Sequence, residues 1–343
     1  MALLESPAGG NQNRAPGILA LTWIAFSISL IAVALRMFTR AVIVRHVGLD
    51  DVFIVVTLVL LLTFSVIWTY YASEGGCRHV YYLSAARQAL LIKINWISQP
   101  FCIMAIATGK MSVAFLILRI LGVAGIWKRR VLHFTIYSVF LGATVDIILT
   151  FTQCIPTRAL WTPSAALHAK CLSPAVLTTF ALIISSYFAA VDLLLALLPI
   201  AIIKELNMKR RRKIVLSAVL SLGVFAAVCA AIKTTKLVSE SSRNDFTWAT
   251  VDLVVWNVNE INVIIVAACI PTLQPLLSGL EATGRTKGYR RSEFSDERIE
   301  LGNRSEAHAV RRSGIGRVPR HVQSPNHDSI QRTIDVDICM SAV

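Results

Sequence analysis

Charged residues are scarce in this chain. Asp, Glu, Lys and Arg make up only 16% of its 343 residues, whereas a soluble globular chain has about 25%. Hydrophobic residues reach 55%, above the roughly 45–50% of soluble domains. This composition excludes a disordered protein, a coiled coil and a disulfide-rich secreted module, and it argues strongly against an ordinary cytosolic enzyme.

Acidic residues are the scarcer of the two charged classes. The chain has 20 Asp and Glu against 34 Lys and Arg, which gives a net charge of +14. An excess of this sign can indicate nucleic-acid binding. Here the basic residues lie beside apolar segments, which favours a membrane surface instead. We therefore expect the lipid bilayer as a partner and no nucleic acid.

Catalytic and metal-binding motifs are also lacking. The sequence shows no His box and no Ser/His/Asp arrangement, and no Cys/His spacing resembles a zinc site. It therefore offers no catalytic residue and no metal site. This favours a protein that is not an enzyme, although acidic residues within apolar segments leave an enzyme open.

The chain has seven long apolar runs instead. A membrane-spanning helix needs about 20 mostly apolar residues, and all seven runs are long enough. They cover approximately residues 17–38, 52–71, 89–118, 131–152, 175–203, 214–233 and 251–273. No run alternates as a barrel strand does, and backbone groups in lipid must be satisfied within the segment. The sequence thus predicts an all-α, seven-transmembrane helix bundle.

Basic residues are concentrated in three alternate loops. They follow the first, third and fifth runs: Arg36, Arg40, Arg45, Arg119, Lys128, Arg129, Arg130, Lys204 and Lys209 through Lys213. The positive-inside rule assigns these loops to the cytoplasm. We therefore expect the N-terminus outside, the C-terminus inside and an integral, multi-pass protein. The plasma membrane is the favoured location, with an endomembrane as the alternative.

Two polar stretches flank the apolar region. Residues 1–16 have no basic region of the kind that opens a signal peptide, so we expect a short extracellular N-terminus. Residues 17–277 form the predicted membrane domain. Residues 278–343 are rich in Arg, Ser and acidic residues, and we expect a disordered cytoplasmic tail.

Two cysteines flank the loop between the fourth and fifth runs. Cys154 lies at the outer end of the fourth run, and Cys171 lies just before the fifth. The outer side is an oxidising space, so a Cys154–Cys171 disulfide is expected. Cys77 and Cys102 also lie near the outer side, and a Cys77–Cys171 bridge stays open as the alternative.

Several ionisable residues lie inside the apolar runs, where they are costly. Lys110, Asp192 and Glu260 lie at similar depth, which predicts that Lys110 pairs with Glu260 or Asp192. Asn257 precedes Glu260 by three residues and shares its helix face, and Asp146 lies in the outer half of the fourth run. These five residues are candidates for a ligand site or a switch. The alternative is that the buried charges only hold the helices in register.

Short motifs follow one another in a set order along residues 17–277. They are Arg36, Arg40, Gly48-Leu49-Asp50-Asp51, Lys110-Met111-Ser112, Arg119-Ile120, Gln153-Cys154-Ile155-Pro156, Trp161, Cys171, Asp192, Pro199, Leu206-Asn207-Met208, Lys213, Leu222-Gly223, Asp245-Phe246-Thr247-Trp248, Trp256, Glu260 and Cys269 through Leu276. In order and spacing they resemble the fungal rhodopsin-like-domain integral membrane proteins. That family includes receptor-like proteins of filamentous fungi and the membrane protein of the satratoxin gene cluster.

The chain departs from the family pattern at two positions. Cys77 occupies the second glycine position of a Gly-x-Gly-x-His pattern, and Lys233 stands where the family often has Arg. The chain has no Asp-Arg-Tyr after the third run and no Asn-Pro-x-x-Tyr in the seventh, so coupling of the animal-receptor kind is unsupported. Residues 251–262 contain no lysine that could form a Schiff base with retinal, and we expect no cofactor.

The resemblance and the buried charges lead to a receptor-like function. A small apolar molecule would bind beneath the Cys154–Cys171 loop, and the buried network would pass the signal to an unidentified cytoplasmic signalling partner. The alternative, implied by the resemblance, is a membrane-bound enzyme or accessory protein of secondary metabolism. A transporter is a third reading, which an odd number of spans without inverted repeats disfavours.

Overall fold

The computed structural model describes residues 10, 12–121, 125–162, 169–205, 228, 232 and 246–273. The chain divides into two compact units, Met1–Leu273 and Gln274–Val343. All described residues belong to the first unit. The tail expected at 278–343 therefore lies outside the described residues.

Six long helices account for most of the described residues. They are α1 (Ala15–Phe38), α2 (Leu49–Ser73), α3 (Ala85–Leu121), α4 (Ile126–Thr152), α6 (Pro174–Glu205) and α8 (Phe246–Cys269). In length and composition all six could cross a membrane. They confirm six of the expected spans. The seventh, expected at 214–233, lies outside the described residues.

Short elements join or extend these helices. η1 (Thr39–Val44) is a π-helical turn that continues α1, and η2 (Val80–Tyr82), η3 (Thr157–Leu160) and η4 (Ile270–Leu273) are 3₁₀ turns. The antiparallel strands β1 (Cys154–Ile155) and β2 (Lys170–Cys171) form a small hairpin between α4 and α6.

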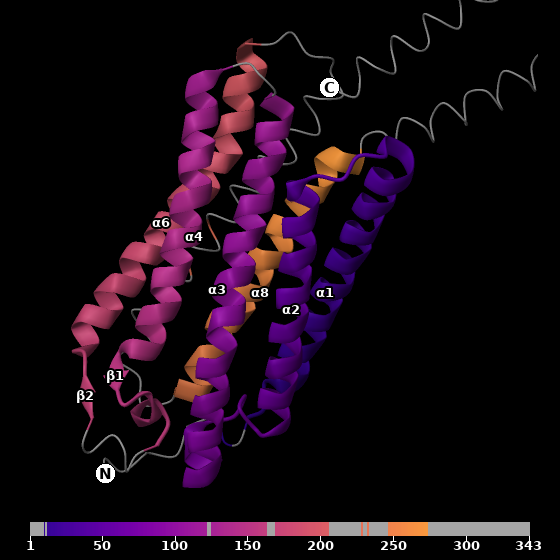
Figure 1. Cartoon of the computed structure of the whole chain (residues 1–343). Helices are drawn as coiled ribbons and strands as arrows, with labels where there is room; N and C mark the ends of the chain where they lie inside the picture. Colours follow the sequence, from indigo (N-terminus) through magenta and orange to yellow (C-terminus); the bar gives the residue numbers. More distant parts are fainter. Residues whose placement is uncertain are drawn as a thin grey trace, which may run out of the picture. The chain divides into compact units, whose positions relative to one another are not determined.

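From α1 to α6 the described helices run alternately up and down, and α8 runs in the same direction as α6, with α3 at the centre (Figure 1). α3 packs against α2, α4, α6 and α8, while α8 also contacts α1 and α2. α1, α3, α6 and α8 begin at the end that carries the β1–β2 hairpin, here called the hairpin end. α2 and α4 begin at the opposite end. Each of the six helices therefore reaches from one end of the bundle to the other.

Local sequence explains where several helices begin. Pro16 lies in the first turn of α1, where a missing N–H costs nothing. Gly48 caps α2, and the Asp51 carboxylate accepts a hydrogen bond from the Gly48 N–H at 3.0 Å. Gly125 precedes α4 with φ of 80°, a left-handed conformation that favours glycine.

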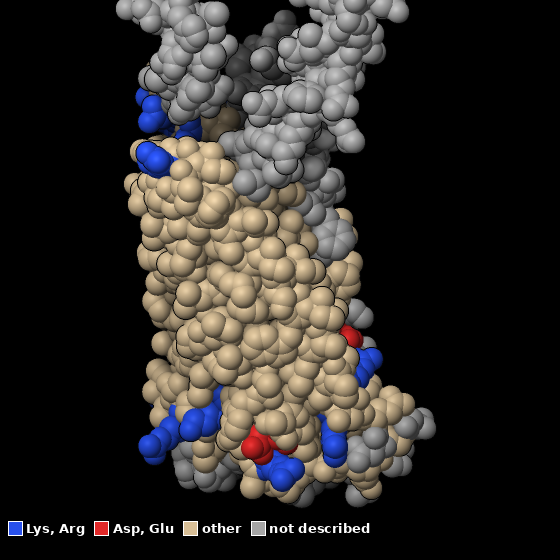
Figure 2. Space-filling view, turned by 90° about the vertical axis from the view of Figure 1, so that its right-hand side faces the viewer, with Lys and Arg blue, Asp and Glu red and all other residues tan. Residues whose placement is uncertain are grey.

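Large apolar side chains cover the outside of the bundle. On α4, Phe134 and Tyr137 are each 72% exposed and Leu141 is 64% exposed. On the face shown in Figure 2, charged side chains lie towards the two ends, and a broad uncharged band separates them. This pattern is that of helices whose outer surface faces lipid hydrocarbon.

Small and polar residues bring the inner helices together. A Cβ added at Gly109 of α3 would lie 2.8 Å from Ile264 Cγ2 of α8, so the two helices touch closely there. Ser29 of α1 donates to Asn262 Oδ1 of α8. Such contacts are typical of helix packing in membranes, where burial of apolar area alone does not drive association.

Candidate functional site

A buried ionic network joins α3, α6 and α8 near mid-bundle. Lys110 Nζ lies 2.6 Å from Asp192 Oδ2 and 3.4 Å from Glu260 Oε1. The side chains of Lys110, Asp192 and Glu260 are 1%, 5% and 0% exposed. The sequence left open whether Lys110 pairs with Asp192 or Glu260, and the structure places it against both. These three residues are called the Lys110 network.

Phe188 of α6 contacts the Lys110 ammonium in two ways. Lys110 Nζ donates a hydrogen bond to the Phe188 carbonyl at 3.2 Å, and it lies 5.6 Å from the centre of the Phe188 ring. An ammonium so placed interacts with both a carbonyl dipole and an aromatic face. The position of α6 at Phe188 and the position of Lys110 are therefore coupled.

A cavity of about 640 Å³ lies between the Lys110 network and the hairpin end. Its walls come from α2, α3, α4, α6 and α8, and η3 adds Leu160. Its apolar lining includes Phe64, Ile103, Ile106 and Phe188. Such a volume and lining are typical of small-molecule sites, which are mostly apolar with a few well-placed polar groups.

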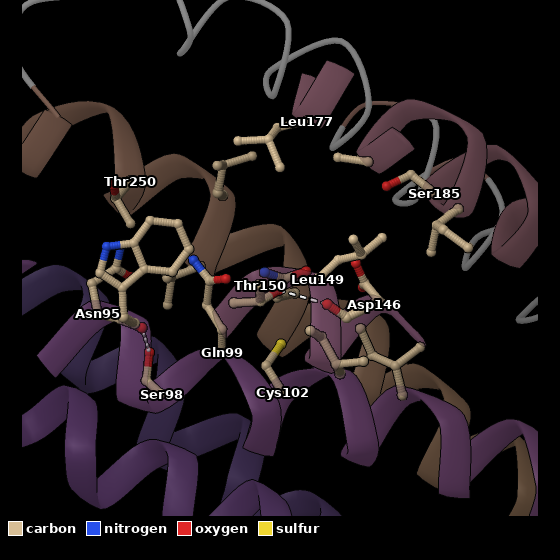
Figure 3. Close-up of a pocket in the computed structure, with 18 of the residues that line it drawn as sticks. Asn95, Ser98, Gln99, Cys102, Asp146, Leu149, Thr150, Leu177, Ser185 and Thr250 are labelled. Atoms are coloured by element: carbon tan, nitrogen blue, oxygen red, sulfur yellow. Dashed lines mark hydrogen bonds between the residues drawn. The ribbon is translucent and has the colours of Figure 1, made fainter. Parts of the chain in front are cut away.

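Polar side chains also face this cavity. Figure 3 shows Gln99 projecting from α3, Asp146 and Thr150 on α4, and Ser185 on α6 around the same space. Asn257 of α8 lines it as well, one turn before Glu260. Of the five candidates from the sequence, three therefore form the Lys110 network. The other two, Asp146 and Asn257, line the cavity.

The two remaining asparagines near Glu260 have other contacts. Asn259 Nδ2 donates to the Val255 carbonyl at 2.9 Å, and Asn262 binds Ser29. The described contacts of these two residues therefore lie within α8 and towards α1.

A disulfide closes the loop that precedes α6. Cys154 and Cys171 are bonded and face each other across the β1–β2 hairpin. Cys77 and Cys102 are buried and form no disulfide, so the alternative Cys77–Cys171 bridge is not formed. Burial raises the pKa of the Cys77 thiol from 9.0 to about 11, because the charged thiolate is disfavoured away from water.

A second buried ionic cluster lies at the end opposite the hairpin. Arg36 Nε lies 2.8 Å from Asp51 Oδ1, and Arg36 Nη2 lies 2.6 Å from Asp50 Oδ2. Arg36 Nη1 donates a hydrogen bond at 2.5 Å to the carbonyl of Ala268, in the last turn of α8. Arg119 adds a contact from α3 to Asp50 at 3.3 Å. This Arg36 cluster joins α1, α2, α3 and α8.

The Arg36 cluster was not predicted as a site. The prediction that Arg36 belongs to the basic loop after the first run was wrong, because Arg36 lies in α1 and is 0% exposed. The sequence offered one signal for this cluster, the carboxylate pair Asp50-Asp51. It stands at the start of a span, directly after a stretch that carries Arg40 and Arg45. A carboxylate pair at a helix start requires nearby cations when it is buried.

Metal binding finds no support in the geometry. Within the described ranges, no group of three or more His, Cys, Asp or Glu residues is arranged to hold a metal ion. In the Lys110 network one ammonium lies near two carboxylates, and in the Arg36 cluster guanidinium groups lie near Asp50 and Asp51.

The fold and these sites define a helical, multi-pass membrane protein with an internal cavity. The model of the fungal rhodopsin domain family matches residues 35–279. Because this match covers more than half of the chain, the chain belongs to that family. The resemblance seen in the motifs is thereby confirmed, and the protein is an integral membrane protein.

One curated relative matches part of the chain. A protein of Emericella nidulans described as a SAT4 family membrane protein is 26% identical over 180 residues. The match covers 52% of this chain and 44% of the relative, so it spans less than half of the relative's length. No solved structure matches the chain.

Proposed function

We propose that the protein is receptor-like, and that a small, largely apolar molecule binds in the cavity and shifts the Lys110 network. The observation that carries this proposal is the double role of Phe188. Its side chain lines the cavity, while its carbonyl accepts the hydrogen bond from Lys110 Nζ. A molecule that displaces Phe188 therefore acts on the network, provided that it binds one arrangement more tightly than the other.

The helix α8 supplies a route from the cavity to the opposite end. Asn257 lines the cavity, Glu260 belongs to the Lys110 network, and the Ala268 carbonyl accepts a hydrogen bond from Arg36. A shift or rotation of α8 changes all three contacts together. The Arg36 cluster is thus the point at which cavity occupancy would reach the far end of the bundle.

The proposal assigns sides and a location to this arrangement. The hairpin end faces outward, which suits its disulfide. The opposite end faces the cytoplasm, where an unidentified signalling partner responds to the basic loops. The plasma membrane is the proposed location, and no chromophore takes part.

The experiment that tests this function is deletion of the gene, followed by metabolite and transcript profiling of the same cultures. A receptor predicts altered transcription with biosynthetic steps intact when precursors are fed. A stalled metabolite with unchanged biosynthetic transcripts would contradict it.

Asp146 favours a second candidate, a membrane-bound enzyme or accessory protein of a secondary-metabolite pathway. Its carboxyl group lines the cavity, where it could act on a bound substrate as a general acid or base. Complementation of the deletion strain with Asp146→Asn separates the two candidates when metabolites and transcripts are measured together. The enzyme predicts a stalled step with unchanged biosynthetic transcripts, whereas the receptor predicts that any change in metabolites accompanies a change in those transcripts.

A further inference from the structure

Three carboxamide side chains line the cavity without a hydrogen-bond partner in the described part of the chain. Asn95 and Gln99 lie one turn apart on α3, and Asn257 lies on α8. All three are partly exposed to the cavity space. By contrast, Asn262 of α8 donates its amide to the Val258 carbonyl. The cavity therefore presents amide donors and acceptors that the described residues leave unpaired.

Unused amides at this depth constrain what fills the cavity. A polar group left unsatisfied on burial costs about 1–3 kcal/mol, and the three amides converge from two helices on one space. In Figure 3 Gln99 extends from α3 into that space, with Asn95 on the preceding turn. A pure hydrocarbon would bury these amides without satisfying them, whereas an oxygenated molecule would satisfy them.

The charge of the cavity constrains its occupant further. Asp146 lines it, and among the described lining residues there is no Lys, Arg or His. A buried carboxylate ligand needs a cation close to it, and the described lining residues offer none. The lining thus disfavours a free acid.

We propose that the occupant is a neutral, oxygenated molecule with an apolar body, whose hydroxyl or carbonyl groups bind Asn95, Gln99 and Asn257. This inference rests on the proposed function and narrows its ligand class. The apolar body packs against aromatic walls such as Phe188, and the oxygens lie against the α3 and α8 amides. A plain hydrocarbon and a free fatty acid are both excluded as preferred ligands.

Three photoreactive probes test this assignment. All carry the same alkyl chain and the same diazirine, and they end in a 1,2-diol, a methyl group or a carboxylate. The full chain in lipid nanodiscs is irradiated with each probe, and mass spectrometry quantifies adducts within 95–106 and 250–257. We expect the diol probe to label these segments about five- to tenfold more than the methyl probe. A preference of this size corresponds to the net contribution of about one hydrogen bond. The carboxylate probe should label them least.

Matched variants tie the preference to the amides. Asn257→Leu should remove most of the diol preference while labelling by the methyl probe is retained. Asn259→Leu is the control, because Asn259 does not line the cavity and already binds the Val255 carbonyl. This variant should keep the wild-type preference.

Three outcomes would overturn the inference. Equal labelling by the diol and methyl probes would show that the amides do not select the ligand. Strongest labelling by the carboxylate probe would show that an acid is accepted. In both cases the cavity would still bind a small molecule, and the proposed function would stand. Absence of adducts from every probe would refute the proposed function as well.

Discussion

Replacement of Lys110 by Met should lower the free energy of unfolding by about 3–5 kcal/mol. The ammonium lies 2.6 Å from Asp192 and 3.4 Å from Glu260, and Lys110 is 1% exposed. Its removal leaves both carboxylates buried without that cation, and loss of one partner of a buried ion pair costs about 3–5 kcal/mol. Lys93 of the same helix is exposed. Lys93→Met is therefore the matched control, expected to change the free energy by less than about 0.5 kcal/mol.

Thermal unfolding of the purified protein, followed by circular dichroism, measures the difference. For a domain of this size, about 1 kcal/mol corresponds to about 2–4 °C, so Lys110→Met should lower the midpoint by about 6–20 °C. The triple variant with Asp192→Asn and Glu260→Gln removes the charges together and should recover at least half of the loss. Equal midpoints for Lys110→Met and Lys93→Met would show that Lys110 does not stabilise the buried carboxylates. A triple variant less stable than the single one would show the same.

Three further predictions concern other parts of the molecule. Arg36→Met should lower the unfolding midpoint by more than Arg119→Met, because Arg36 is fully buried and the Arg119 side chain is 27% exposed; the same melts check this, and the reverse order would contradict it. Joint replacement of Cys154 and Cys171 by Ala should lower the free energy of unfolding by about 3 kcal/mol, since the bridge spans a sequence separation of 17. Unfolding of the wild-type protein with and without reductant measures the same loss of stability. An unfolding curve that does not change on reduction would be inconsistent with a bridge. Because burial raises the pKa of Cys77 to about 11, this residue stays in its unreactive thiol form at pH 8. The rate of its alkylation, followed by mass spectrometry, should therefore rise about tenfold per pH unit up to about pH 11. A rate that levels off near pH 9 would show an ordinary thiol.

Hydropathy and charge in the sequence predicted much of this architecture. The lengths of the apolar runs predicted the six described helices, because lipid leaves few alternatives to a helix. Burying a charge in lipid is energetically unfavourable, so the charged residues within the apolar runs were expected to pair. The structure brings Lys110, Asp192 and Glu260 together. These inferences worked because they depend on single segments and on depth along each segment.

Other features depend on how the segments face one another, and a single sequence does not contain that information. The sequence could not show that Asn95 and Gln99 share a cavity with Asn257, more than 150 residues away, because helix rotation decides which side chains converge. Arg36 was misread for a related reason. A basic residue near the end of an apolar run has the same sequence pattern whether it lies in the loop or is buried against Asp51.

The central claim is that the cavity acts through the Lys110 network, and complementation with Glu260→Gln tests it most directly. A deletion strain receives the wild-type gene, Glu260→Gln or Asp252→Asn, with protein levels in the membrane matched. Asp252 is the control because it lies on the same helix but is partly exposed and pairs with Arg14. We expect wild type and Asp252→Asn to restore the transcript profile and Glu260→Gln to fail to restore it. Full restoration by Glu260→Gln would show that the cavity does not act through the Lys110 network.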